Sequence, residues 1–164
     1  MLKLWGIVLL ITGDVLLVRY LGEQAKKKVR CLWEIIVFLG TVTDSVTGWK
    51  RTLEKAILQE KHPGVFPKIF QNKFSQHRKV LPLREALKTS LEELPLTKES
   101  CETCTRYFQK LGKSTEKSTE ECFCQTKRQL ERILKQLQEE LPKTTKLISA
   151  SVYSISAMTA VLLL

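Results

Sequence analysis

Residues 29–42 read VRCLWEIIVFLGTV, and this stretch decides the fold class. Its apolar side chains recur at intervals of three and four, at Val29, Leu32, Trp33, Ile36, Leu39 and Val42. Such spacing places them on one face of a helix, because an α-helix makes one turn in about 3.6 residues. The pattern predicts a helix over Glu23–Thr43 with this face in the core.

The same period returns in further segments that are separated by turn-forming residues. Asp44–Gly48 and His62–Gly64 interrupt it, and Pro82 suits the first turn of a helix. Two short helices are predicted around Trp49, Leu53, Ala56 and Ile57, and around Val65, Phe66, Ile69, Phe70 and Phe74, and a third covers Leu83–Leu94. The next helix begins after an N-cap at Thr97, contains Cys101, Cys104, Tyr107, Phe108 and Leu111, and stops at Gly112. The last one has a stripe of apolar residues within Thr115–Leu141. No segment alternates as a strand would. We therefore expect an all-α fold, a bundle of about six helices.

Two apolar segments, Leu4–Leu21 and Leu147–Leu164, flank this bundle. As a helix, the first covers roughly 27 Å, close to the hydrocarbon thickness of about 30 Å. A cleaved signal peptide would end in small residues, whereas Arg19–Glu23 follow here, which favours an uncleaved anchor. The predicted organisation is a transmembrane anchor over 1–22, a helical domain over 23–146 and a second transmembrane helix over 147–164.

Charge sets the orientation of the two predicted spans. The chain has 27 Lys and Arg against 17 Asp and Glu, a formal net charge of +10, and basic residues crowd the inner flanks. By the positive-inside rule the central domain is expected in the cytoplasm, where the same flanks attract the anionic lipid bilayer. No aromatic or motif signal of a nucleic-acid module accompanies the charge, so we expect no nucleic-acid partner.

Catalytic patterns are missing from the sequence. There is no glycine-rich phosphate loop, and no serine can be singled out without a paired base. His62 and His77 are isolated, with no nearby acid or cysteine arrangement in the sequence. We expect a protein that is not an enzyme.

Four cysteines form the sharpest local signal: Cys101, Cys104, Cys122 and Cys124. A turn at Gly112 would let the two pairs face each other, and four thiolates can hold zinc in a structural site. Against this, Cys122 and Cys124 lie about 200° apart on a helix, and reduced cysteine is a common buried residue. Cytoplasmic thiols are expected to stay reduced. The main expectation is no cofactor, with zinc as the alternative.

Asp14 lies within the first predicted span, where an ionised carboxylate is costly. It either bonds to a hydroxyl of the second span or to another membrane subunit, or it is hydrated beside Gly13 where the bilayer is thinned. Both interpretations stay open.

Taken in order, the segments resemble the stage III sporulation protein AB family of endospore-forming bacteria. The residues that carry the resemblance are Met1–Gly6, Arg84–Leu87, Leu96–Glu99, Phe108–Gly112 and the tail from Lys146–Leu147 to Val161–Leu164. The chain departs from the family pattern at Leu87, Ser100 and Gln109, and it has serines where the last span usually has glycine. Leu87 and Ser100 are expected in the core or at a cap.

The resemblance implies a component of the channel complex between mother cell and forespore, on the mother-cell side of the outer forespore membrane. It also implies a cytoplasmic fold like the F-type platform subunits of type II secretion, with a secretion-type hexameric ATPase and other membrane subunits of the channel as partners. Within that role, we expect a basic face at Lys127, Arg128 and Arg132 to bind the partner. The alternatives are a membrane-anchored metal or redox sensor that uses the four cysteines, and a general secretion or pilus platform.

Overall fold

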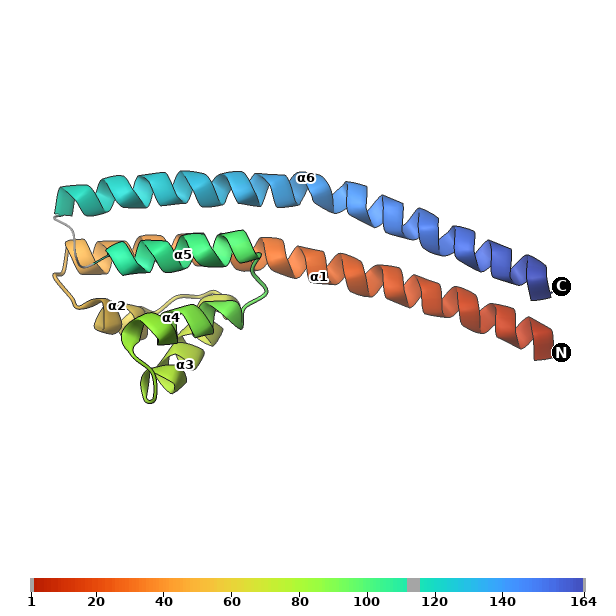
Figure 1. Ribbon diagram of the computed structural model, residues 1–164, viewed down its shortest axis with the longest axis horizontal. Coiled ribbons are helices and arrows are strands. Elements are labelled where there is room, and N and C mark those ends of the chain that lie inside the picture. Colours follow the sequence, from red (N-terminus) through yellow and green to blue (C-terminus); the bar gives the residue numbers. More distant parts are fainter. Residues whose placement is uncertain (1, 112–115, 164) are drawn as a thin grey trace. The chain divides into compact units, whose positions relative to one another are not determined.

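A computed structural model describes the backbone of residues 2–111 and 116–163. Side chains are described within these ranges except at 2–11, 14, 116, 117, 144, 145, 148, 153, 155–157 and 159–163. The chain forms six helices over these ranges: α1 Leu2–Thr47, α2 Leu53–Gln59, α3 Val65–Arg78, α4 Leu83–Glu92, α5 Lys98–Lys110 and α6 Glu116–Leu163 (Figure 1). No strand occurs in the backbone so described, which confirms the predicted all-α class.

The chain divides into two compact units, and α1 and α6 contribute to both. The terminal unit combines the residues up to Lys27 with those from Gln136 onward. The core unit comprises Lys28–Lys135 and contains α2, α3, α4 and α5 in full. The predicted division into three parts, at 22/23 and 146/147, stays a prediction.

In the part of the chain that the structure describes, no helix has a long enough apolar stretch to cross a membrane. The predicted spans, Leu4–Leu21 and Leu147–Leu164, fall in large part on side chains outside the described set.

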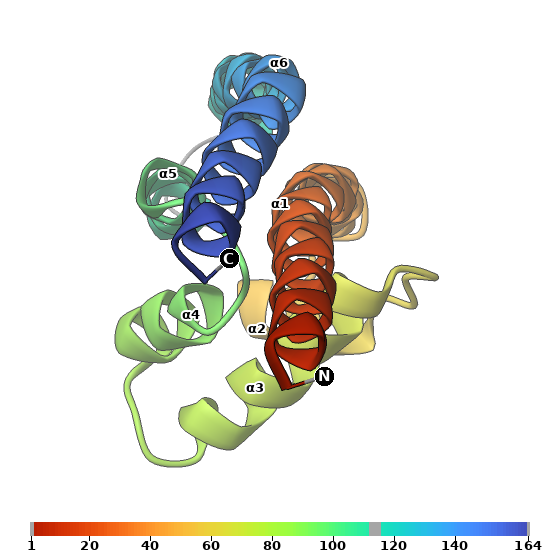
Figure 2. The ribbon, with the colours of Figure 1, turned by 90° about the vertical axis from the view of Figure 1, so that its right-hand side faces the viewer.

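Within the core unit, α1, α5 and the first half of α6 form a triangle of three helices, the first layer of the unit (Figure 2). Tyr107 of α5 lies at its centre, where its hydroxyl hydrogen-bonds with Thr43 of α1 and its ring lies 6.0 Å from the ring of Phe123 of α6. α1 and α6 lie close together at Gly40, where a Cβ atom would be in contact with Phe123 Cζ at 3.4 Å. These contacts make the layer one packed structure.

The second layer of the core unit contains α2, α3 and α4 (Figure 1). Phe70 of α3 joins it to the first layer, since its ring centroid lies 5.8 Å from that of Phe38 of α1 and 6.0 Å from that of Phe108 of α5. All three side chains are at most 2% exposed. Burial of a Phe side chain contributes about 1.5–3 kcal/mol, so this aromatic cluster is a main source of the unit's stability.

Several predicted core positions are confirmed and several are wrong. Leu32, Ile36, Leu39 and Val42 are buried, as are Cys101, Cys104, Tyr107, Phe108 and Leu111. The exposed ones include Trp33 at 56%, Trp49 at 74%, Val65 and Ile69. Trp33 is exposed because the buried stripe of α1 runs instead through Ile35 and Phe38, on the other side of Leu32.

The predicted interruption at Asp44–Gly48 is confirmed in its last part. α1 continues through Asp44, Ser45 and Val46 and ends at Thr47, directly before Gly48. The first predicted span and the helix over Glu23–Thr43 are one continuous helix, and α6 likewise continues through Pro142. The predicted stop at Gly112 lies outside the described residues.

The predicted cap of α5 is confirmed. Thr97 Oγ1 accepts the Ser100 N–H at 3.3 Å. Ser100 is fully buried and Leu87 is 2% exposed, in agreement with their predicted places at a cap and in the core. Pro82 precedes α4 as its N-cap rather than lying in its first turn.

Candidate functional sites

The predicted basic face lies on α6 within the core unit. Lys127, Arg128 and Arg132 are exposed, while Leu130 and Ile133 bury the opposite side of the helix. Lys127 forms a long ion pair with Glu131 at 3.9 Å. Arg128 and Arg132 are one turn apart, and no ion pair is found for either among the described side chains. Two neighbouring guanidinium groups can bind carboxylates in pairs.

The cysteines lie in different environments. Cys101 and Cys104 are buried in α5, whereas Cys122 is half-buried and Cys124 is exposed on α6. Burial raises the pKa of both α5 thiols, and the neighbouring sulfur atoms of Cys101 and, to a smaller extent, Cys31 in α1 raise the pKa of Cys104 further. The described side chains include no group of three or more His, Cys, Asp or Glu that could hold a metal ion. The α5 thiols pack as protonated, apolar groups at neutral pH.

Asp14 lies within helix α1, and its side chain is outside the described set.

The expectation that His77 has no acidic neighbour is wrong. Its Nε2 atom lies 2.8 Å from Oε1 of Glu93, whose Oε2 is 2.8 Å from Lys73 Nζ. Hydrogen bonds from Lys73 and His77 lower the pKa of the Glu93 carboxyl. His62 is buried at 9% exposure and its Nδ1 accepts the Gly64 N–H at 3.1 Å. His77 thus links α3 to the end of α4, and the ring centroid of His62 lies 6.1 Å from that of Phe38 in α1.

Glu34 is a buried carboxylate in α1 that sequence reasoning missed. Its side chain is 5% exposed, and its Oε1 atom pairs with Arg30 Nε at 2.8 Å. Oε2 accepts the Phe66 N–H at 3.0 Å, at the start of α3. Burial alone would raise the pKa of Glu34, but hydrogen bonds from Phe66 and Arg30 outweigh it and hold the pKa below its ordinary value. Glu34 thus caps α3 in place of Gly64, which has no side chain.

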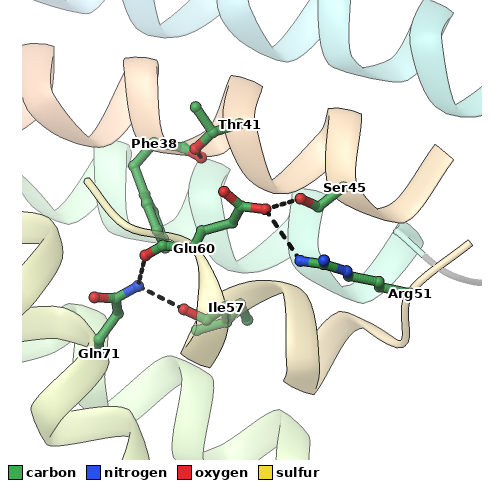
Figure 3. A network of polar contacts seen from close by, with 7 residues as sticks. All are labelled: Phe38, Thr41, Ser45, Arg51, Ile57, Glu60 and Gln71. Atoms are coloured by element: carbon green, nitrogen blue, oxygen red, sulfur yellow. Dashed lines mark hydrogen bonds and ion pairs between the residues drawn. The ribbon is translucent and has the colours of Figure 1, made fainter. Parts of the chain in front are cut away.

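A polar network joins α1, α2 and α3 (Figure 3). Gln71 of α3 donates to the carbonyls of Ile57 and Glu60, each at 2.7 Å, and so satisfies the end of α2. The Glu60 carboxylate accepts a hydrogen bond from Ser45 of α1 and lies 3.7 Å from Arg51 Nη1. The network fixes Arg51, whose guanidinium carbon also lies 5.6 Å from the centroid of the Trp49 ring.

Beside Arg51 lies a cavity of about 640 Å³ in the core unit. The end of α1, the α1–α2 connection and the first residue of α2 form one side of it, and the first turn of α4 and the end of α5 form the other. Its volume falls within the range of about 300–1,000 Å³ that is typical of ligand sites. Sequence reasoning missed it, because its walls come from segments up to 65 positions apart, Val46 and Leu111.

A family model described as stage III sporulation protein AB matches residues 3–164. No curated protein matches the chain, and no solved structure matches it.

Proposed function

Since the chain belongs to the stage III sporulation protein AB family, we propose that this sporulation protein is a non-enzymatic membrane platform. In this proposal it is part of the channel complex between mother cell and forespore, and it couples a secretion-type hexameric ATPase to the channel's membrane subunits. The match over residues 3–164 is the observation that carries the proposal.

Membrane attachment would use the two terminal apolar segments, Leu4–Leu21 and Leu147–Leu164, with the helices between them in the mother-cell cytoplasm. The sequence supports this topology, because the basic residues Lys26–Lys28, Lys143 and Lys146 flank the inner ends of both segments. Asp14 would then lie within the first span and bond to a polar group of the second span or of another channel subunit.

The ATPase would dock on the basic face of α6. Lys127, Arg128 and Arg132 are exposed there, and the helix beneath them is held by the buried side chains of Leu130 and Ile133. A rigid helix that presents guanidinium groups suits an acidic partner surface, because complementary charge raises association rates and suppresses wrong partners.

Charge reversal of this face tests the proposal. The triple variant Lys127→Glu, Arg128→Glu and Arg132→Glu should lower co-purification of the secretion-type ATPase from sporulating cells by about tenfold. The matched control is Lys55→Glu, Lys68→Glu and Lys79→Glu, which makes the same charge change at exposed positions on or next to α2 and α3. Equal recruitment by both variants would remove the α6 face from the mechanism.

Localisation tests the role itself. A fluorescent fusion should accumulate only in the mother cell during sporulation and gather at the engulfing membrane. Uniform fluorescence in vegetative cells would contradict the channel role.

A further inference from the structure

The floor of the 640 Å³ cavity is apolar. Its apolar lining consists of Val46, Leu53, Leu83, Leu87, Phe108 and Leu111. Five of these residues belong to α1, α2, α4 and α5, and Leu111 directly follows α5. Phe108 and Leu87 are also buried in the core. A floor built on core residues is held in place, so the cavity is pre-formed for an apolar group of a ligand.

The remaining lining is basic or neutral. Lys50, Arg51 and Arg84 contribute to it, together with Thr52 and Gln109, and among the residues that the structure describes no acidic side chain does. Arg84 Nη2 donates to Gln109 Oε1 at 3.1 Å, which holds this guanidinium at the cavity. The positive charge of Arg51 is balanced by Glu60, whose Oε1 atom lies 3.7 Å from Arg51 Nη1. No ion pair is found for Lys50 or Arg84 among the described side chains. The described part of the rim therefore has uncompensated positive charge.

The connection that forms one wall has two further features. Lys50 has a φ of 48°, a left-handed conformation that costs a non-glycine residue free energy. Trp49 is 74% exposed and stacks with Arg51. Tryptophan and arginine are enriched among the residues that dominate binding energy at protein interfaces.

We propose that this cavity binds an acidic peptide segment of a partner protein, with one or two apolar side chains inserted between flanking Asp or Glu residues. Lys50 and Arg51 lie on one wall of the cavity and Arg84 on the other. This arrangement suits a peptide with a carboxylate on each side of an inserted apolar side chain better than one compact lipid headgroup. Thr52 and Gln109 offer hydrogen-bonding groups for the peptide backbone. A second copy of this chain is a poor occupant, because its net charge of +10 would repel the rim. None of the basic residues of the α6 face, Lys127, Arg128 and Arg132, lines the cavity.

Selection from a random dodecapeptide phage library tests the proposal. The full-length protein in detergent is the bait, and the variant Lys50→Glu, Arg84→Glu is the counter-selection bait. Enriched peptides should combine Asp or Glu with Leu, Ile, Met or Phe, and they should not be retained by the variant. The absence of enrichment, or enrichment of basic or purely polar sequences, would overturn the proposal.

Affinity measurements then locate the site. Fluorescence anisotropy with a selected peptide should show about tenfold weaker binding to Lys50→Glu, Arg84→Glu and to the floor variant Leu83→Gln. Lys55→Glu, Lys68→Glu has the same charge change outside the cavity and should bind as the wild type does. Circular dichroism verifies that the variants are folded. Equal binding by all of them would overturn the assignment.

Competition with lipid distinguishes a peptide site from a headgroup site. Phosphatidylglycerol vesicles that displace the peptide from the wild type, and that bind the rim variant less well, would assign the cavity to a lipid headgroup and overturn the peptide. The α6 variant Lys127→Glu, Arg128→Glu, Arg132→Glu should keep full peptide affinity, so failure of the α6 docking face and failure of this cavity remain distinguishable.

Discussion

The carboxylate of Glu34 in α1 caps helix α3 by accepting the backbone N–H of Phe66 at 3.0 Å. The first N–H groups of a helix lack partners within it, and a negative charge there is also stabilised by the helix dipole. Arg30 balances the negative charge of Glu34, with its Nε atom 2.8 Å from Glu34 Oε1. The contact joins elements 32 positions apart and fixes how α3 packs against α1.

Removal of the Glu34 carboxylate should be costly. Glu34→Ala leaves the start of α3 without a cap and is expected to lower the free energy of unfolding by about 2 kcal/mol. Chemical denaturation followed by circular dichroism measures the loss. Glu121→Ala, at an exposed position of α6, should change it by less than about 0.5 kcal/mol. Equal effects would mean that the cap contributes little.

Acid should weaken the same contact. The folded pKa of Glu34 is below its ordinary value of 4.5, so its contribution is complete above that pH and is lost as the pH falls through the folded pKa. The difference in unfolding free energy between the wild type and Glu34→Gln should therefore be constant from about pH 7 to pH 6 and shrink below about pH 4.5. A difference that grows on acidification would contradict this assignment.

Gly64 leaves room for the cap. A Cβ atom at this position would lie 2.7 Å from Glu34 Oε2 and 3.0 Å from both His62 Nδ1 and Pro67 Cδ, although the backbone at φ −66° and ψ 152° accepts any residue. Gly64→Ala should cost about 1–2 kcal/mol because it displaces the carboxylate. In a Glu34→Ala background the same change should cost much less, and a double-mutant cycle measures the coupling. Additive effects would show that the clash lies elsewhere.

Gly40 lies where α1 and α6 approach each other in the core unit. Alanine there reaches ordinary contact with Phe123 at 3.4 Å and improves helix propensity, so Gly40→Ala should raise the unfolding free energy by up to about 1 kcal/mol. Gly40→Leu should lower it by about 1–3 kcal/mol through overpacking. Gly22→Leu is the control, because a Cβ atom at Gly22 would meet none of the described atoms within 4 Å. Tolerance of leucine at both sites would contradict a close approach.

Thiol modification should follow exposure. Cys124 is exposed and should react first with a maleimide, whereas burial raises the pKa of Cys31 to about 12 and also raises that of Cys104. Peptide mapping by mass spectrometry should find Cys31 and Cys104 unmodified in the folded protein and all five cysteines modified in denaturant. Rapid labelling of Cys104 in the folded state would contradict its burial.

Helical periodicity predicted the class of the fold and the positions with regular spacing. It identified Leu32, Ile36, Leu39 and Val42 on α1, while the cap at Thr97 followed from the preference of helix N-termini for threonine. It failed at Trp33, because a helix tolerates apolar residues beside its buried face and the sequence does not fix which edge of the stripe faces the core.

Contacts between residues that are far apart in the chain could not be predicted from the sequence. His77 meets Glu93 across 16 positions and Glu34 meets Phe66 across 32, and neither pair has a local spacing signature. The two cysteine motifs were conspicuous in the sequence, yet Cys101 and Cys104 lie in the core while Cys124 is exposed. The rim cations Lys50 and Arg84 come together only through the packing of α4 and α5 against the end of α1.

Trp33 and Trp49 both stand in solvent, at 56% and 74% exposure. Both indoles should therefore fluoresce as hydrated indole in the native state, and denaturation should shift their emission wavelength only slightly. Unfolding curves are better recorded from backbone ellipticity. Trp49 stacks on Arg51, which lines the cavity. A ligand that covers this indole would shift its emission to the blue, and the chain thereby contains its own optical reporter of occupancy, with Trp5→Phe and Trp33→Phe removing the background signal.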